Sequence, residues 1–107
     1  MTWKLELSDN KFGGAELKNL PAYENLREIR LANTNIASFD DIKFLSKFKS
    51  LLLLELEECP ISKQVNFREK IFEILPDLLY LDNLTRDGQA YQNGIKKSYL
   101  KNFAIFL

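Results

Sequence analysis

The chain has 107 residues, of which 46% are hydrophobic and 28% are charged, a balance typical of one globular domain and not of a disordered or membrane protein. Fifteen basic and fifteen acidic side chains cancel, and the absence of histidine excludes Ser-His-Asp catalysis, Cys-His catalysis and histidine-based metal sites. We therefore expect a protein that is not an enzyme and that uses neither a metal nor a cofactor.

The charges are distributed unevenly along the chain. Residues 1–89 carry a net charge of −3, whereas residues 90–107 carry +3, contributed by three lysines. A single cysteine excludes an internal disulfide and is typical of a reducing compartment. No apolar run approaches the roughly 18 residues that a membrane span needs, and no signal peptide is recognisable at the start. We expect a nuclear or cytoplasmic protein without a membrane partner.

A repeated leucine pattern is the strongest signal in the sequence. The pattern L-x-x-L-x-L-x-x-N/C-x-L is the signature of leucine-rich repeats. It is matched in register by LELSDNKF (5–12), LREIRLANTNI (26–36) and LLLLELEECPI (51–61), with a degenerate copy at Leu78 and Leu81. Copies that recur every 24 to 27 residues predict an α/β solenoid, with a short parallel sheet on its concave face and helices or turns on its convex face.

The segments between these copies carry helix signals. GGAELKNLPAYENL (13–26) predicts a short helical turn before Pro21. In the next connection, Ser38 and Asp41 predict a capped start, and the apolar stripe that follows is Ile42, Leu45 and Phe48.

The last connection predicts the longest helix. Asn66 and Glu69 have the spacing of a capping box, and Pro76 ends the helix. The apolar side chains at helical spacing between them are Phe67, Ile71, Ile74 and Leu75.

The repeat fixes which side chains point inward. Because alternate residues of a strand point to opposite faces, Leu54 and Leu56 face the core and Glu55 and Glu57 face outward. We expect the residues at the asparagine position of each repeat to form an internal ladder that satisfies backbone groups at the turns. Threonine and cysteine hydrogen-bond less well than asparagine, so we expect an imperfect ladder, with a buried structural cysteine and not a reactive thiol. These residues are Asn10, Thr34 and Cys59.

The sequence resembles the acidic leucine-rich nuclear phosphoprotein family between residues 5 and 88. KLELSDNKFGG (4–14) is similar to a middle repeat of that family, and FREKIFEILPDLLYLD (67–82) is similar to its carboxyl-terminal cap. The cap motif also occurs in a spliceosomal leucine-rich repeat subunit, whereas the combination of SDN with Gly-Gly favours the acidic nuclear group. We expect residues 1–88 to form the repeats and their cap, and residues 89–107 to form a basic and apolar extension.

The resemblance implies protein binding. Members of the family bind histones, associate with chromatin and inhibit a serine/threonine phosphatase. The sequence departs from the family pattern in three ways: the first repeats are missing, the acidic tail is missing, and Val65-Asn66 replaces an Asn-Asp pair before the cap helix. Because the acidic tail contributes strongly to histone binding in the family, we expect weaker histone binding here. The alternative function is a structural scaffold subunit of a ribonucleoprotein complex.

The repeat register also predicts the residues that a protein partner would meet. Reading across the strands, one column holds Glu6, Arg30, Glu55 and Asp82. Neighbouring columns add the acidic side chains Glu57 and Glu58 and the outward-pointing apolar side chains Leu53 and Tyr80. We expect a basic segment to dock here, attracted by the acidic charge and anchored on Leu53 and Tyr80. The alternative is a solvated sheet face, and nucleic acid is not expected on an acidic surface. The complete set of expected partner-binding residues is Glu6, Glu28, Arg30, Leu53, Glu55, Glu57, Glu58, Tyr80 and Asp82.

The two ends of the chain suggest a second kind of contact. The first strand lacks the amino-terminal cap that protects repeat proteins. The tail carries six large apolar residues, Tyr99, Leu100, Phe103, Ile105, Phe106 and Leu107. Self-association through the uncapped first strand or through the apolar tail is one expectation. The alternative is that the tail packs on its own domain.

Overall fold

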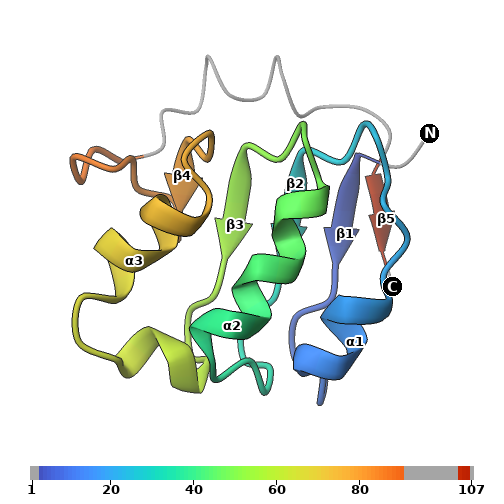
Figure 1. The fold of residues 1–107 in the computed structure, drawn as a ribbon, viewed down its shortest axis with the longest axis horizontal. Coiled ribbons are helices and arrows are strands. Elements are labelled where there is room, and N and C mark those ends of the chain that lie inside the picture. Colours follow the sequence, from blue (N-terminus) through green and yellow to red (C-terminus); the bar gives the residue numbers. More distant parts are fainter. Residues whose placement is uncertain (1–2, 91–103, 107) are drawn as a thin grey trace.

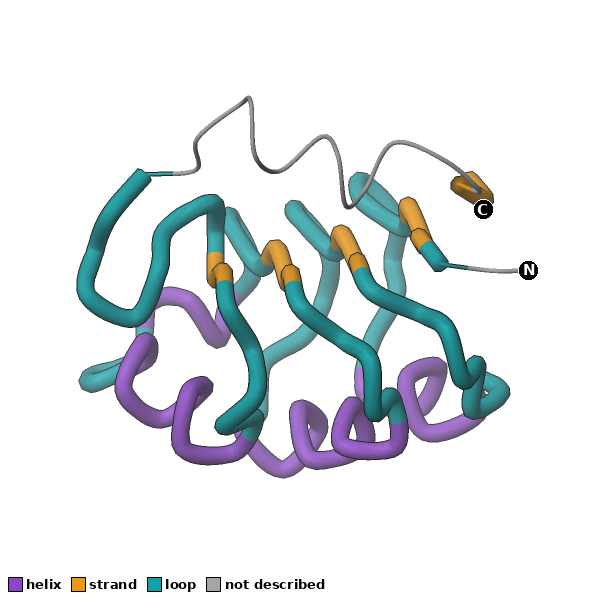
Figure 2. Tube along the Cα trace, turned by 90° about the horizontal axis from the view of Figure 1, so that it is seen from above, coloured by secondary structure: helices purple, strands orange, loops and turns teal. Residues whose placement is uncertain are grey.

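The strands of the chain form one parallel sheet, and the computed structural model describes residues 3–90 and 104–106. The strands are β1 (Lys4–Glu6), β2 (Glu28–Arg30), β3 (Leu53–Glu55), β4 (Tyr80–Leu81) and β5 (Ala104–Phe106). Their order in the sheet is β4-β3-β2-β1-β5, and every neighbouring pair is parallel. The helical segments lie together on the opposite side of the molecule from the strands (Figures 1 and 2).

The register of the sheet follows the sequence repeat. Leu5 is aligned with Ile29, Ile29 with Leu54, and Leu54 with Leu81. All four side chains are fully buried in one hydrophobic core, as are Leu56 and its equivalent Leu31. The predicted parallel sheet and the inward direction of Leu54 and Leu56 are therefore confirmed.

The turns after the first three strands share one backbone conformation. Asp9, Asn33 and Glu58 have φ values of 64°, 55° and 63°, in the left-handed region. A left-handed residue reverses the chain direction, and asparagine or aspartate tolerates it better than other non-glycine residues. The Asn33 amide also donates a 3.0 Å hydrogen bond to the Asp9 carboxylate. Glu58 is the least favourable residue of the three for this conformation.

The predicted internal ladder forms in part. The Thr34 hydroxyl donates to the Leu31 carbonyl at 2.7 Å and lies 3.2 Å from the Cys59 sulfur, which itself contacts the Leu31 carbonyl at 2.9 Å. Cys59 is fully buried, as expected of a structural cysteine. Asn10 is exposed at the edge of this arrangement, where its amide donates to the Leu7 carbonyl at 3.0 Å.

The short helical segments begin and end at recognisable signals. They are α1 (Gly14–Asn19), α2 (Phe39–Ile42), η1 (Lys43–Lys47), η2 (Pro60–Lys63) and α3 (Phe67–Ile74). The Ser38 hydroxyl caps α2 by accepting from the Asp40 N–H at 3.0 Å. Gly14 permits the close approach of α1 to α2, because a Cβ at this position would overlap the Asp41 carboxylate.

The predicted capping box at the start of α3 is wrong. Asn66 adopts a left-handed conformation with φ 59° and its side chain makes no capping hydrogen bond. Its carbonyl instead accepts from the Lys70 N–H at 3.0 Å, so backbone geometry alone begins the helix. The predicted apolar stripe is confirmed, because Phe67, Ile71 and Leu75 are buried and Ile74 packs against them.

The edge of β1 is not exposed, and the pairing supports the alternative in which the tail packs on its own domain. β5 pairs with β1 in parallel, with Lys4 aligned with Ala104 and Glu6 aligned with Phe106. The tail therefore covers the first strand of its own chain, at the edge of the sheet farthest from β4 (Figure 1). The apolar residues Tyr99, Leu100, Phe103 and Leu107 lie outside the described residues.

The conformation of Glu58 generates a stability prediction. Glu58→Asn should raise the free energy of unfolding by about 0.5–1 kcal/mol, because asparagine adopts the left-handed conformation at lower cost. The matched control is Glu57→Asn, which removes the same charge at a neighbour outside the set of positive-φ residues. Urea denaturation measures the free energy of unfolding of both variants. Equal changes at the two positions would contradict the conclusion that the left-handed conformation of Glu58 costs stability.

Candidate protein-binding face

The site is built on the sheet face that points away from the helices, which we call the outer sheet face. Its first column consists of Lys4, Glu28, Leu53 and Tyr80, and its second consists of Glu6, Arg30 and Glu55, continued by Asp82 after β4. Glu57 and Glu58 follow β3 at the turn. The nine residues predicted from the sequence are thus carried by neighbouring strands and by the turns that follow them.

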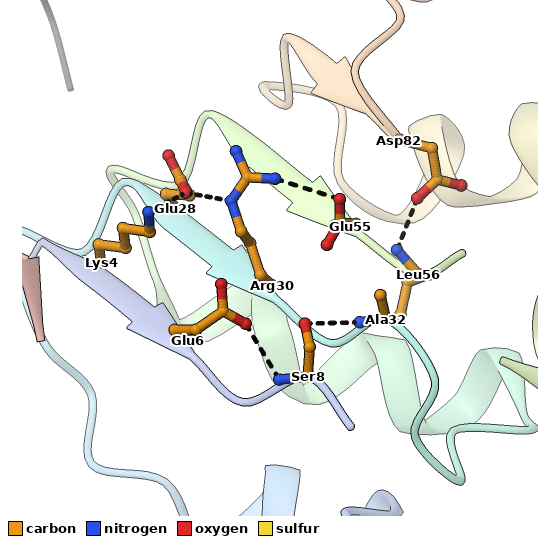
Figure 3. Close-up of polar contacts among 9 residues, drawn as sticks. All are labelled: Lys4, Glu6, Ser8, Glu28, Arg30, Ala32, Glu55, Leu56 and Asp82. Atoms are coloured by element: carbon orange, nitrogen blue, oxygen red, sulfur yellow. Dashed lines mark hydrogen bonds and ion pairs between the residues drawn. The ribbon is translucent and has the colours of Figure 1, made fainter. Parts of the chain in front are cut away.

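A chain of alternating charges runs across the first two strands and into the third (Figure 3). Glu28 accepts from the Lys4 ammonium at 3.2 Å and from the Arg30 guanidinium at 2.5 Å. Arg30 also reaches Glu55 on β3 at 3.1 Å. Burial lowers the pKa of Arg30, but the hydrogen bond and charge of Glu28, with the charge of Glu55, outweigh it and raise the pKa. Both cations of the face are therefore engaged with carboxylates.

Two of the expected contact residues are buried. Glu28 is 2% exposed and Leu53 is fully buried, so neither displays its side chain for a partner. Glu28 is held between Lys4 and Arg30, and Leu53 lies in register between Glu28 and Tyr80. The prediction that Leu53 is an exposed apolar anchor is wrong, and Tyr80 is half-buried.

Asp82 lies on the outer sheet face and also hydrogen-bonds backbone groups of the neighbouring strand. Its carboxylate accepts from the Leu56 N–H at 2.6 Å (Figure 3). Its own N–H donates to the Leu54 carbonyl at 2.9 Å. On the first two strands the Ser8 hydroxyl accepts from the Ala32 N–H at 3.2 Å. The sequence pattern did not reveal these two roles, because the pattern carries no information on hydrogen bonds.

The carboxylates of the third strand and the cap crowd one another. Burial raises the pKa of Glu55, and the charge of Arg30 lowers it less than burial raises it. Burial also raises the pKa of Asp82, opposed by the Leu56 hydrogen bond and reinforced by the charge of Glu57. No described cation is paired with Glu57 or Glu58, and both are exposed. The uncompensated negative charge therefore gathers at the end of β3.

Arg68 holds β4 and the turn that follows it beside this acidic region. Its guanidinium donates to the carbonyls of Leu81, Leu84 and Thr85 at 2.8–3.3 Å. A hollow of about 380 Å³ lies between Arg68 and the acidic side chains Glu57, Glu58 and Asp82. Among the described residues, no group of acidic or cysteine side chains could hold a metal ion, and no helix there is long and apolar enough to cross a membrane.

The raised pKa of Asp82 gives a pH-dependent prediction. A carboxyl group whose pKa is higher in the folded than in the unfolded state favours folding below its unfolded pKa, and this contribution is lost as the pH rises through its folded pKa. Asp82→Asn resembles the protonated form and can still accept from the Leu56 N–H. The variant should therefore gain stability over the wild type as the pH rises from about 3.9, the unfolded value, towards 7. Thermal unfolding at several pH values measures the difference, and a constant or shrinking difference would contradict the assigned direction.

Comparison with known proteins identifies the family. No protein-family model matches the chain. Curated relatives include an acidic leucine-rich nuclear phosphoprotein 32 family member A from Drosophila pseudoobscura pseudoobscura, 37% identical over 85% of this chain and 35% of its own length. The protein of the same name from Drosophila melanogaster is 34% identical over 84% of this chain and 34% of its own length. The chain thus spans about a third of these relatives, and within that span it belongs to the acidic leucine-rich nuclear phosphoprotein 32 family.

Proposed function

We propose that the chain is a non-enzymatic protein-interaction module that binds lysine- and arginine-rich segments on its outer sheet face. The observation that carries this proposal is the charge balance of the face. Six carboxylates share it with two cations, Lys4 and Arg30, which gives a formal net charge of −4. Both cations are already engaged, so the remaining negative charge attracts a cationic partner.

The binding unit proposed is a short α/β solenoid formed by residues 1–88, with residues 89–107 as an extension. The repeated register of inward aliphatic residues and the helical segments on one side of the sheet support this architecture. Repeat proteins commonly bind partners through the surface that their strands or loops present together. Since both relatives carry the word nuclear in their names, we propose a nuclear location.

The partner proposed is a flexible basic segment of the kind found in histone tails. Glu57 and Glu58 are exposed at one end of the face, and Glu6 is half-buried at the other end. The Glu6 carboxylate accepts only a local 3.1 Å hydrogen bond from the Ser8 N–H among its described contacts. An extended segment with several cations can therefore meet carboxylates on both β1 and the β3 turn. If the outer sheet face instead binds a basic surface of a folded partner, inhibition of a serine/threonine phosphatase is the alternative function.

A charge-reversal pair tests this function. Glu6→Lys combined with Glu57→Lys should weaken binding of a lysine-rich peptide at least about tenfold, or about 1.4 kcal/mol, because attraction becomes repulsion at two points of the face. Glu69→Lys combined with Glu73→Lys is the matched control, since it makes the same charge change at exposed positions of α3. Fluorescence anisotropy with a labelled peptide measures both affinities.

Ionic strength separates charge-driven binding from other modes. Raising the salt concentration from about 0.1 M to about 1 M shortens the Debye length from about 10 Å to about 3 Å, so affinity for the wild type should fall steeply. If the peptide does not bind even at low salt, or if the α3 control variant loses as much affinity as the face variant, the proposed binding surface is wrong.

A further inference from the structure

The outer edge of β1 is occupied by a strand from the far end of the chain. β5 lies parallel to β1 in a register of three residue pairs, from Lys4 with Ala104 to Glu6 with Phe106. A strand at the end of a sheet presents unpaired N–H and C=O groups, which bind any extended segment of suitable shape. This edge therefore accepts a strand that lies outside the repeat pattern.

The topology allows the chain to supply this strand to itself. Ala90 bridges to Leu84, next to β4 at one end of the sheet, whereas β5 lies at the other end. Thirteen residues separate Ala90 from Ala104, and a chain of that length reaches up to about 43 Å at about 3.3 Å per residue. Four strand spacings of about 4.8 Å amount to only about 19 Å. The connection is therefore long enough for β5 to pair within one chain.

The occupant is chemically unlike the partner proposed for the outer sheet face. Residues 102–107 read NFAIFL and contain no charged side chain. A sheet edge binds an extended segment through main-chain hydrogen bonds, so acidic side chains are not needed. A pairing of three residues is short, and strands of this length are stable only with support from their surroundings.

We propose that the outer edge of β1 is a docking site for an extended, uncharged apolar segment of a partner protein that runs parallel to β1. β5 is the internal competitor for this site. A partner segment with the pattern of residues 102–107 binds when β5 leaves the edge, and the covalent connection gives β5 an effective concentration in the millimolar range. The docking edge is independent of the acidic side chains, so it stands or falls separately from the proposed function.

A disulfide trap tests the internal occupant in the full-length chain. Glu6→Cys with Phe106→Cys joins two registered positions about 4.8 Å apart, within the Cα separation of disulfides. Glu6→Cys with Ala104→Cys is the staggered control, with a separation of about 8 Å that a disulfide does not bridge. We expect an internal disulfide in the first variant alone, read by mass spectrometry. Equal oxidation of both variants, oxidation of neither, or disulfides only between chains would overturn the pairing.

A peptide competition tests the docking site itself. Ala104→Pro with Ile105→Pro removes two successive N–H groups, one of which must face β1, because successive N–H groups of a strand point to opposite sides. A labelled NFAIFL peptide should bind this variant at least about tenfold more tightly than the wild type, given the effective concentration of β5. It should not bind the oxidised Glu6→Cys, Phe106→Cys chain. The peptide of reversed sequence is the orientation control. Equal affinity for all three chains, or no binding to the proline variant, would overturn the proposal.

Discussion

The stacking of aliphatic side chains between parallel strands is the interaction on which the rest of the structure depends. Leu5, Ile29, Leu54 and Leu81 lie in register and are fully buried. Each buried aliphatic side chain of this size contributes about 1.5–3 kcal/mol. Because strand residues alternate between faces, the same register that buries these side chains fixes the columns of the outer sheet face.

The register of the strands places the uncompensated negative charge of the outer sheet face at the end of β3. The cations Lys4 and Arg30 occur on the first two strands, where they pair with Glu28 and Glu55. The β3 turn and Asp82 add carboxylates, and the nearby Arg68 guanidinium donates to the carbonyls of Leu81, Leu84 and Thr85. Burial together with the charge of Glu57 raises the pKa values of Glu55 and Asp82. A cationic segment would relieve this crowding. The electrostatics of the face therefore follow from where the sequence places two basic residues.

Much of the fold could be predicted from the sequence, because the repeat specifies periodicity, register and the inward side chains. The column containing Glu6, Arg30 and Glu55 follows from that register alone. The conformation of Asn66 could not be predicted, since its spacing to Glu69 is the same whether or not the side chain caps the helix. The pairing of β5 with β1 and the burial of Leu53 depend on contacts between residues far apart in sequence, which a local repeat does not encode.

An NMR titration of the isotope-labelled chain with a lysine-rich peptide tests the central claim most directly, because it locates the bound cationic segment on the molecule. The account predicts that at low salt the largest amide shifts occur at the outer columns and the β3 turn, including Ser8, Ala32 and Glu57, and disappear at high salt. Shifts centred on α3, or shifts that persist at high salt, would contradict an acidic binding face built on the register of the strands.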